Sequence, residues 1–215
     1  MTDVKGSEAR EARYRDIISK LTLMSDTLMR NVFKDKECTE HLLRIILGDP
    51  GIEVLEQTLQ KDYKNLWGRS AVLDCVAKDQ SGRIFDVEIQ QEGEGATPRR
   101  ARYYSGLMDM NLLKTGEDFE RLPETYVIFI TGDDVLGHGE PIYHIEKEIK
   151  EVRQSFGDGA RIIYADASRR DETELGRLMH DLNCRESKEM HSPVLAKRVY
   201  ELRRRSEELS ICARN

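Results

Sequence analysis

The fold is decided by the stretch Arg69-Ser-Ala-Val-Leu-Asp-Cys-Val-Ala-Lys-Asp-Gln-Ser-Gly-Arg-Ile-Phe-Asp-Val-Glu-Ile-Gln-Gln91, which has the pattern of a β-hairpin that carries acids. Side chains alternate between the two faces of a β-strand, so the second strand presents one apolar face and one polar face. The apolar face consists of Phe85, Val87 and Ile89, and the polar face of Asp86, Glu88 and Gln90. We expect the apolar face to meet the core and the acidic face to remain available for chemistry.

The turn between the two strands brings a further acid to the same place. The connection from Lys78 to Arg83 is short and contains Gly82, which suits a backbone with positive φ. Folding back at this turn leaves Asp74 within a residue or two of facing the segment from Asp86 to Glu88. Clustered carboxylates raise one another's pKa unless a cation neutralises them, and such oxygen-rich clusters suit magnesium or manganese. The hairpin is therefore a candidate metal site.

Further motifs accompany the hairpin in a fixed order along the chain. They are Ser25-Asp26 before Val32-Phe33, Arg102-Tyr103-Tyr104, and the segments 113–119, 122–131, 137–143 and 178–184. As an ordered series, these motifs resemble the PD-(D/E)XK nuclease family transposases, relatives of the recombination-promoting nucleases, over about residues 20–205. The resemblance implies an α/β fold of the restriction-endonuclease-like type, in which a mixed β-sheet is flanked by helices, with a helical C-terminal extension.

The resemblance also assigns roles to the residues of the hairpin. It implies that Asp74 and Glu88 hold Mg²⁺, or Mn²⁺, together with the backbone carbonyl of Ile89. Gln90 stands where the wider superfamily has a lysine, so it would orient the attacking water or the phosphate without supplying a charge. Asp26, in the N-terminal motif, either supports the site or caps a helix.

Two functions of different classes follow from these residues. The first is a metal-dependent DNA endonuclease that hydrolyses phosphodiester bonds and is linked to transposition or DNA recombination. The alternative is a catalytically silent module that keeps the nuclease fold and binds nucleic acid or protein. The two acids with a polar third residue, Gln90, favour the enzyme. The missing lysine and the net charge of −6 favour the silent module.

The main candidate for DNA contact is an arginine cluster that follows Thr97-Pro98. An acidic chain binds DNA only where it concentrates its cations, and Arg99, Arg100 and Arg102 form such a concentration. Thr97 and Pro98 are typical of a helix start, whose positive end would add to the attraction for phosphate. The alternative is a solvated face in which these arginines pair with Glu92 and Glu94. Arg102, before Tyr103-Tyr104, could instead pair internally with an acid of the hairpin.

The composition indicates an intracellular chain with one domain. The length of 215 residues allows one α/β core, no run of 18 apolar residues exists, and the polar N-terminus lacks the apolar region of a secretory signal. We expect a polar arm at 1–20, a nuclease-like domain at 21–185 and a C-terminal helix at 186–215, located in the cytoplasm without membrane contact. The four cysteines lack paired spacing and are expected to be reduced. A homo-oligomer is left open.

The remaining elements follow from periodicity and start signals. Strands are expected at 52–60, 69–78, 83–90, 126–130 and 161–164, and helices at 35–47, 97–114, 142–154, 171–182 and from 193 onward. Asp35 and Gly48 are the start and stop signals of the first helix, and the capping-box spacing of Asp171 with Glu174 opens the helix at 171–182. Within the last part of the chain, His180, Cys184 and His191 have spacings that would suit zinc. The alternative for these three is a packed cysteine beside exposed histidines.

Overall fold

The computed structural model describes residues 20–65 and 68–212, with side chains described as far as residue 204. The predicted arm at 1–20 lies outside the described residues except for Lys20. Within the described part, a six-stranded mixed sheet has the order β1-β2-β3-β4-β8-β5. The strands are β1 (Val54–Tyr63), β2 (Ala71–Asp79), β3 (Ile84–Gln90), β4 (Thr125–Thr131), β5 (Ile142–Ile145) and β8 (Ala160–Asp166). The first three strands are antiparallel, and β3, β4 and β8 are parallel to one another.

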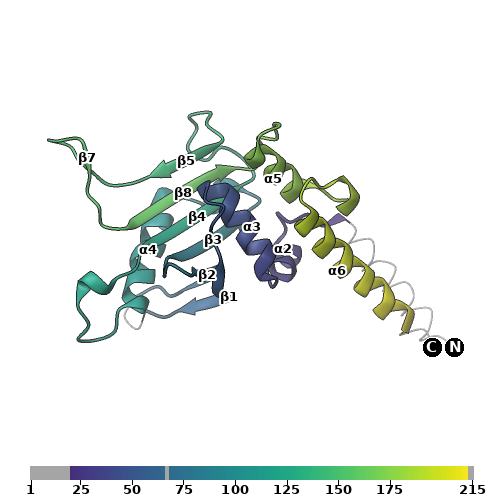
Figure 1. Cartoon of the computed structure of the whole chain (residues 1–215), viewed down its shortest axis with the longest axis horizontal. Coiled ribbons are helices and arrows are strands. Elements are labelled where there is room, and N and C mark those ends of the chain that lie inside the picture. Colours follow the sequence, from purple (N-terminus) through teal and green to yellow (C-terminus); the bar gives the residue numbers. More distant parts are fainter. Residues whose placement is uncertain (1–19, 66–67, 213–215) are drawn as a thin grey trace.

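Helices cover both faces of this sheet. One core cluster joins Phe85, Val87 and Ile89 to apolar residues of four helices, and a second cluster joins Val127 and Phe129 to a single helix. The four helices are α2 (Asp26–Val32), α3 (Lys36–Leu47), α5 (Glu174–Asn183) and α6 (Pro193–Cys212), and the single helix is α4 (Pro98–Leu112). Figure 1 shows α3 in front of the sheet and α4 behind it. The predicted fold class, a mixed sheet flanked by helices, is confirmed.

The predicted hairpin forms with the expected turn. Gly82 has a φ of 84°, a conformation that a side chain would strain. The buried carboxylate of Asp79 accepts hydrogen bonds from the backbone amides of Ser81 and Arg83, and it also pairs with the Arg83 guanidinium at 2.7 Å. These contacts fix the pairing of β2 with β3, in which Val76 lies opposite Asp86.

The start and stop signals of two helices also behave as predicted. Asp35 caps α3 by accepting a hydrogen bond from the Glu37 amide, and Gly48 ends the helix with a φ of 62°. Thr97 caps α4 by accepting from the Arg100 amide, with Pro98 in the first turn. For α5 the cap is Thr173, whose hydroxyl accepts from the Gly176 amide, rather than the predicted Asp171. Asp171 instead accepts from the Thr173 amide.

The predicted helix at 142–154 is wrong. Residues Ile142–Ile145 form β5, which pairs antiparallel with β8, and the next residues form β6 (Glu148–Ile149) and β7 (Gln154–Ser155). The segment looked helical because charged and apolar residues are mixed in it. In the structure, the open edge of β8 offers backbone partners to β5, and this pairing outweighs local propensity. Figure 1 shows the chain around β7 reaching away from the sheet.

The C-terminal helix begins against the domain. Leu195 and Val199 of α6 are fully buried in the first core cluster. Further along, Figure 1 shows α6 leading away from the sheet. None of the described helices is long and apolar enough to cross a membrane.

Candidate active site

Glu88 is the centre of the candidate site. Its side chain is fully buried in β3. One carboxylate oxygen, Oε1, accepts a hydrogen bond from the backbone amide of Asp74 at 2.9 Å, and the other, Oε2, accepts from the Nη2 of Arg100 at 2.8 Å. The two acids predicted to share a site therefore lie next to each other, joined by a direct hydrogen bond.

Asp74 lies on β2, where the flanking pairs of β1 and β2 place it opposite Gln60. Regular pairing holds at Leu59 with Cys75 and again at Lys61 with Leu73. Between these pairs, Gln60 has a left-handed backbone with a φ of 53°, and its side-chain amide donates a hydrogen bond to the Asp74 carboxylate at 3.0 Å. No local sequence pattern pointed to Gln60, because its contact with Asp74 depends on the pairing of β1 with β2. This hydrogen bond helps to orient the half-buried Asp74 carboxylate.

Asp86 lies on the same face as Glu88 and is also fully buried. Among the described residues, neither of its carboxylate oxygens has a hydrogen-bond partner, and the buried hydroxyl of Tyr63 also lacks one. Burial, together with the charges of Glu88 and Asp74, raises the pKa of Asp86 well above its usual range. Burying an ionised carboxylate without a partner is costly, so in the absence of a cation the surroundings of Asp86 favour its protonated form.

The expectation of an open acidic face is therefore wrong. Both Asp86 and Glu88 are inaccessible, because α4 covers this face of the sheet and a hydrophobic cluster surrounds the acids. Burial and the charge of Asp74 raise the pKa of Glu88 to about 7. Burial, followed by the charge of Asp26, raises the pKa of Asp74. The site is thus a group of three carboxylates whose negative charges oppose one another.

Arg100 supplies a positive charge to this group. Besides Glu88, its guanidinium donates to the hydroxyl of Tyr104 at 2.8 Å and to the carbonyl of Gly95 at 3.0 Å. It also lies over the rings of Tyr104 and Phe129, at 4.8 and 5.6 Å from the ring centroids. Residues four apart lie on the same face of a helix, so Arg100 and Tyr104 both face the sheet.

The three predicted DNA-binding arginines consequently differ in their surroundings. Arg99 and Arg102 are exposed on α4, and neither forms an ion pair with a described residue. The pairing of an arginine with a hairpin acid, which the sequence suggested for Arg102, is made by Arg100. Neither Glu92 nor Glu94 pairs with an arginine among the described residues, so the predicted pairing with nearby acids is not seen.

Gln90 ends β3 beside this ion pair. A Cβ atom added at Gly95 would lie 3.0 Å from both the Gln90 Oε1 and the Arg100 Nη1. The amide of Gln90 and the guanidinium of Arg100 therefore flank the same glycine. The side chain of Ile89 points to the opposite face, into the first core cluster, so only its backbone carbonyl is a candidate ligand.

Asp26 approaches the site from α2. The residue before the helix is Ser25, so Asp26 is not the N-cap but the first helical residue. Asp26 forms an ion pair with Arg30, and its charge contributes to the raised pKa of Asp74. This influence places Asp26 near Asp74, in agreement with a supporting role at the site.

The donor set fits a hard divalent cation. Carboxylate oxygens are the ligands that Mg²⁺ and Mn²⁺ prefer, and the unpartnered oxygens of Asp86 show that this group of acids lacks positive charge. Arg100 alone opposes three carboxylates. A divalent ion at Asp74 and Glu88 would balance the remaining charge.

Comparison with known proteins agrees with this geometry. A family model described as PD-(D/E)XK nuclease family transposase matches residues 25–177, a span that contains every residue named in this candidate site. No curated protein and no solved structure matches the chain.

Proposed function

The chain belongs to the PD-(D/E)XK nuclease family transposases, and from this premise we propose that it is a metal-dependent endonuclease that hydrolyses phosphodiester bonds in DNA. The observation that carries the proposal is the joined pair of Asp74 and Glu88, with Arg100 bound to the second acid. Two carboxylates on adjacent strands can hold a divalent cation, and that cation, together with Arg100, would stabilise negative charge on a reacting phosphate.

Asp74 and Glu88 would hold Mg²⁺, or Mn²⁺, together with the carbonyl of Ile89. When bound, the ion supplies Lewis-acid polarisation of the phosphate and a lowered pKa for a water molecule. The hydrogen bond from Gln60 orients Asp74, and the bond from the Asp74 amide orients Glu88. Both carboxylates are therefore preorganised before a ligand arrives.

Because the lysine is missing, other residues must orient the attacking water and supply the positive charge. We assign these two tasks to different residues. Gln90 can donate and accept hydrogen bonds, so it would orient the attacking water or a phosphate oxygen. Arg100 carries the positive charge that an amide lacks and holds it 2.8 Å from Glu88. Arg99 and Arg102, which are exposed on the same helix, would contact the DNA backbone.

The alternative of a silent module has one observation in its favour. Both carboxylate oxygens of the buried Glu88 already have donors, so a metal ion would have to share these oxygens with the Asp74 amide and with Arg100. In a silent module this ion pair would be permanent and would serve only to hold α4 on the sheet.

One assay separates the two functions. Purified protein is incubated with supercoiled plasmid in Mg²⁺, in Mn²⁺ and in EDTA, and DNA binding is measured in parallel by fluorescence anisotropy. An endonuclease converts the plasmid to nicked and linear forms with either metal and leaves it intact in EDTA. DNA binding without cleavage under any metal condition would support the silent module.

A further inference from the structure

A second group of metal-ligating side chains lies at the junction of α5 and α6. His180, Asp181 and His191 offer ligand atoms that all lie within 4.8 Å of one another. His180 and Asp181 lie in the last turn of α5, whereas His191 belongs to the segment that leads into α6. Their location also separates them from the acids of the hairpin, since α5 and α6 pack on the face of the sheet opposite α4.

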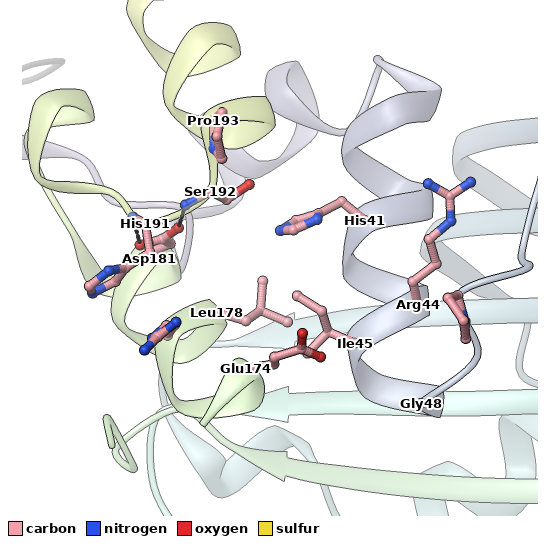
Figure 2. Close-up of a pocket in the computed structure, with 12 residues that line it drawn as sticks. His41, Arg44, Ile45, Gly48, Glu174, Leu178, Asp181, His191, Ser192 and Pro193 are labelled. Atoms are coloured by element: carbon pink, nitrogen blue, oxygen red, sulfur yellow. Dashed lines mark hydrogen bonds between the residues drawn. The ribbon is translucent and has the colours of Figure 1, made fainter. Parts of the chain in front are cut away.

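The carboxylate of Asp181 is held in a fixed orientation that suits a metal ligand. Its side chain is fully buried, and its two oxygens accept hydrogen bonds from the backbone amides of His191, at 2.8 Å, and Ser192, at 2.7 Å. Figure 2 shows these bonds as dashed lines that connect α5 to the start of α6. A carboxylate oxygen can accept two hydrogen bonds, so these two amides orient the Asp181 carboxylate without saturating it.

The two histidines complete the group. The Nδ1 atom of His180 lies 3.1 Å from the Oδ1 atom of Asp181, and the rings of His180 and His191 have centroids 4.7 Å apart. Two ligands on a tetrahedral zinc ion at bond lengths near 2 Å lie about 3.3 Å apart. The contact between His180 and Asp181 is thus close to the separation that a shared ion requires.

Access to the group is open. Asp181 and His191 line a cavity of about 560 Å³ that also includes His41 and Arg44 of α3. In Figure 2, the α3 residues lie across this cavity from Asp181 and His191. The side chain of His180 is 37% exposed, so an ion and a coordinated water molecule can reach the ligands.

We propose that His180, Asp181 and His191 bind a divalent transition-metal ion, and that zinc is the ion that this donor set suits best. Imidazole nitrogens select zinc and its neighbours over magnesium, and three protein ligands leave a fourth position for water. The bound ion connects the end of α5 to the entrance of α6 and thereby fixes the helix that packs on α2 and α3. This site is independent of the proposed nuclease function.

The structure also identifies which residue does not belong to the set. Cys184, which the sequence placed with the two histidines, is buried, and its Sγ atom donates to the carbonyl of Glu186 at 3.2 Å. The ligand set therefore contains a carboxylate rather than a thiolate. Cobalt(II), which replaces zinc in proteins, distinguishes the two, since a cobalt thiolate absorbs strongly in the near ultraviolet.

The test uses the full chain without a histidine tag, freed of metal and titrated with ZnCl₂ by calorimetry. Millimolar Mg²⁺ is present throughout, so that the acids of the hairpin are occupied. We expect one zinc ion per chain, and a loss of affinity of about a hundredfold or more in the double variant His180→Gln and His191→Gln. A double variant of two distant histidines, His138→Gln and His144→Gln, is the control and should bind zinc like the unaltered chain.

A second measurement keeps the test decisive if a variant folds poorly. At a hundredfold excess over its dissociation constant, zinc should raise the Tm of the unaltered protein by roughly 5–10 °C, and the control variant should show the same rise. Equal zinc affinity in the unaltered chain and in the His180/His191 variant would overturn the proposal. A near-ultraviolet thiolate band with Co²⁺ would also overturn it, because that band would show a cysteine thiolate among the ligands.

Discussion

The backbone amide of Asp74 donates a hydrogen bond to the carboxylate of Glu88 at 2.9 Å. This bond joins β2 to β3 beside the point where Gln60 of β1 contacts the Asp74 carboxylate. Two acids that the sequence places 14 residues apart thus become neighbours. The structure places them in a buried environment, so the protonation state of Glu88 depends on whether a metal ion binds to these two acids.

Metal binding is expected to depend on pH. A metal ion requires the ionised form of Glu88, whose pKa lies at about 7 in the absence of metal. Below pH 7, the apparent affinity for Mn²⁺ should fall about tenfold per pH unit for each proton displaced, and above pH 8 it should level off. Calorimetry in buffers of different ionisation enthalpy measures the protons released. An affinity that stays constant from pH 5.5 to 8 would contradict the assignment of Glu88 as a ligand.

Replacing Asp86 should stabilise the metal-free fold. The pKa of Asp86 is raised from an ordinary value of 3.8, so above about pH 4 the folded state holds a proton that the unfolded state has lost. The free energy of unfolding therefore falls as pH rises from 4 towards the folded pKa. Asp86→Leu removes both this effect and an unpartnered buried carboxyl, and it should raise the free energy of unfolding by about 1–3 kcal/mol.

Urea unfolding at pH 5 and pH 8 measures this gain, which should be larger at pH 8. Asp62→Leu, on the exposed surface of β1, is the matched control and should change stability little. A loss of stability in Asp86→Leu would show that Asp86 has a favourable partner.

Arginine substitutions should separate cleavage from DNA binding. Arg100→Gln removes the cation bonded to Glu88, and the cleavage rate should fall about 100-fold or more with a smaller effect on DNA affinity. Arg99→Gln and Arg102→Gln should weaken binding equally for unrelated DNA sequences, each reducing the slope of log affinity against log salt by about one. Anisotropy titrations at several salt concentrations measure these slopes. An unchanged slope in both variants would exclude phosphate contact by either arginine.

Gln90 should affect the rate without being required for folding. Because Gln90 is half-buried beside Gly95 and Arg100, Gln90→Ala should lower the cleavage rate, whereas Gln90→Lys should be tolerated and restore a charge near the phosphate. Circular dichroism verifies the fold, and single-turnover cleavage gives the rate. Equal rates for both variants and the unaltered enzyme would show that Gln90 takes no part.

The sequence predicted the hairpin because its signals are local. Alternation in residues 84–90 and a glycine with positive φ at position 82 are sufficient to place Asp74 and Glu88 on neighbouring strands. The burial of these acids was not predictable, because it depends on α4, which follows the hairpin in sequence but covers it in space. Gln60 was missed for a similar reason, since its contact with Asp74 depends on the pairing of β1 with β2.

The arginines of α4 and the strand β5 show two further limits of prediction from the sequence. The phase of α4 would have placed Arg100 with Tyr104 on the sheet-facing side, so the pairing of Arg100 with Glu88 had a signal that spacing alone could have revealed. The segment 142–154 had no such signal, because its strand exists only where the edge of β8 is free to pair.

The most direct measurement of the central claim is the rate of plasmid nicking in Mn²⁺ by the unaltered chain and by the variants Asp74→Asn and Glu88→Asn, with Asp62→Asn as the control. Each site variant removes a metal ligand and keeps a polar side chain, and circular dichroism verifies that it folds. The account predicts that both lose at least about 100-fold in rate, that the control retains full activity, and that EDTA abolishes nicking by the unaltered chain. Full activity in Asp74→Asn or Glu88→Asn, or nicking by the unaltered chain that persists in EDTA, would contradict it.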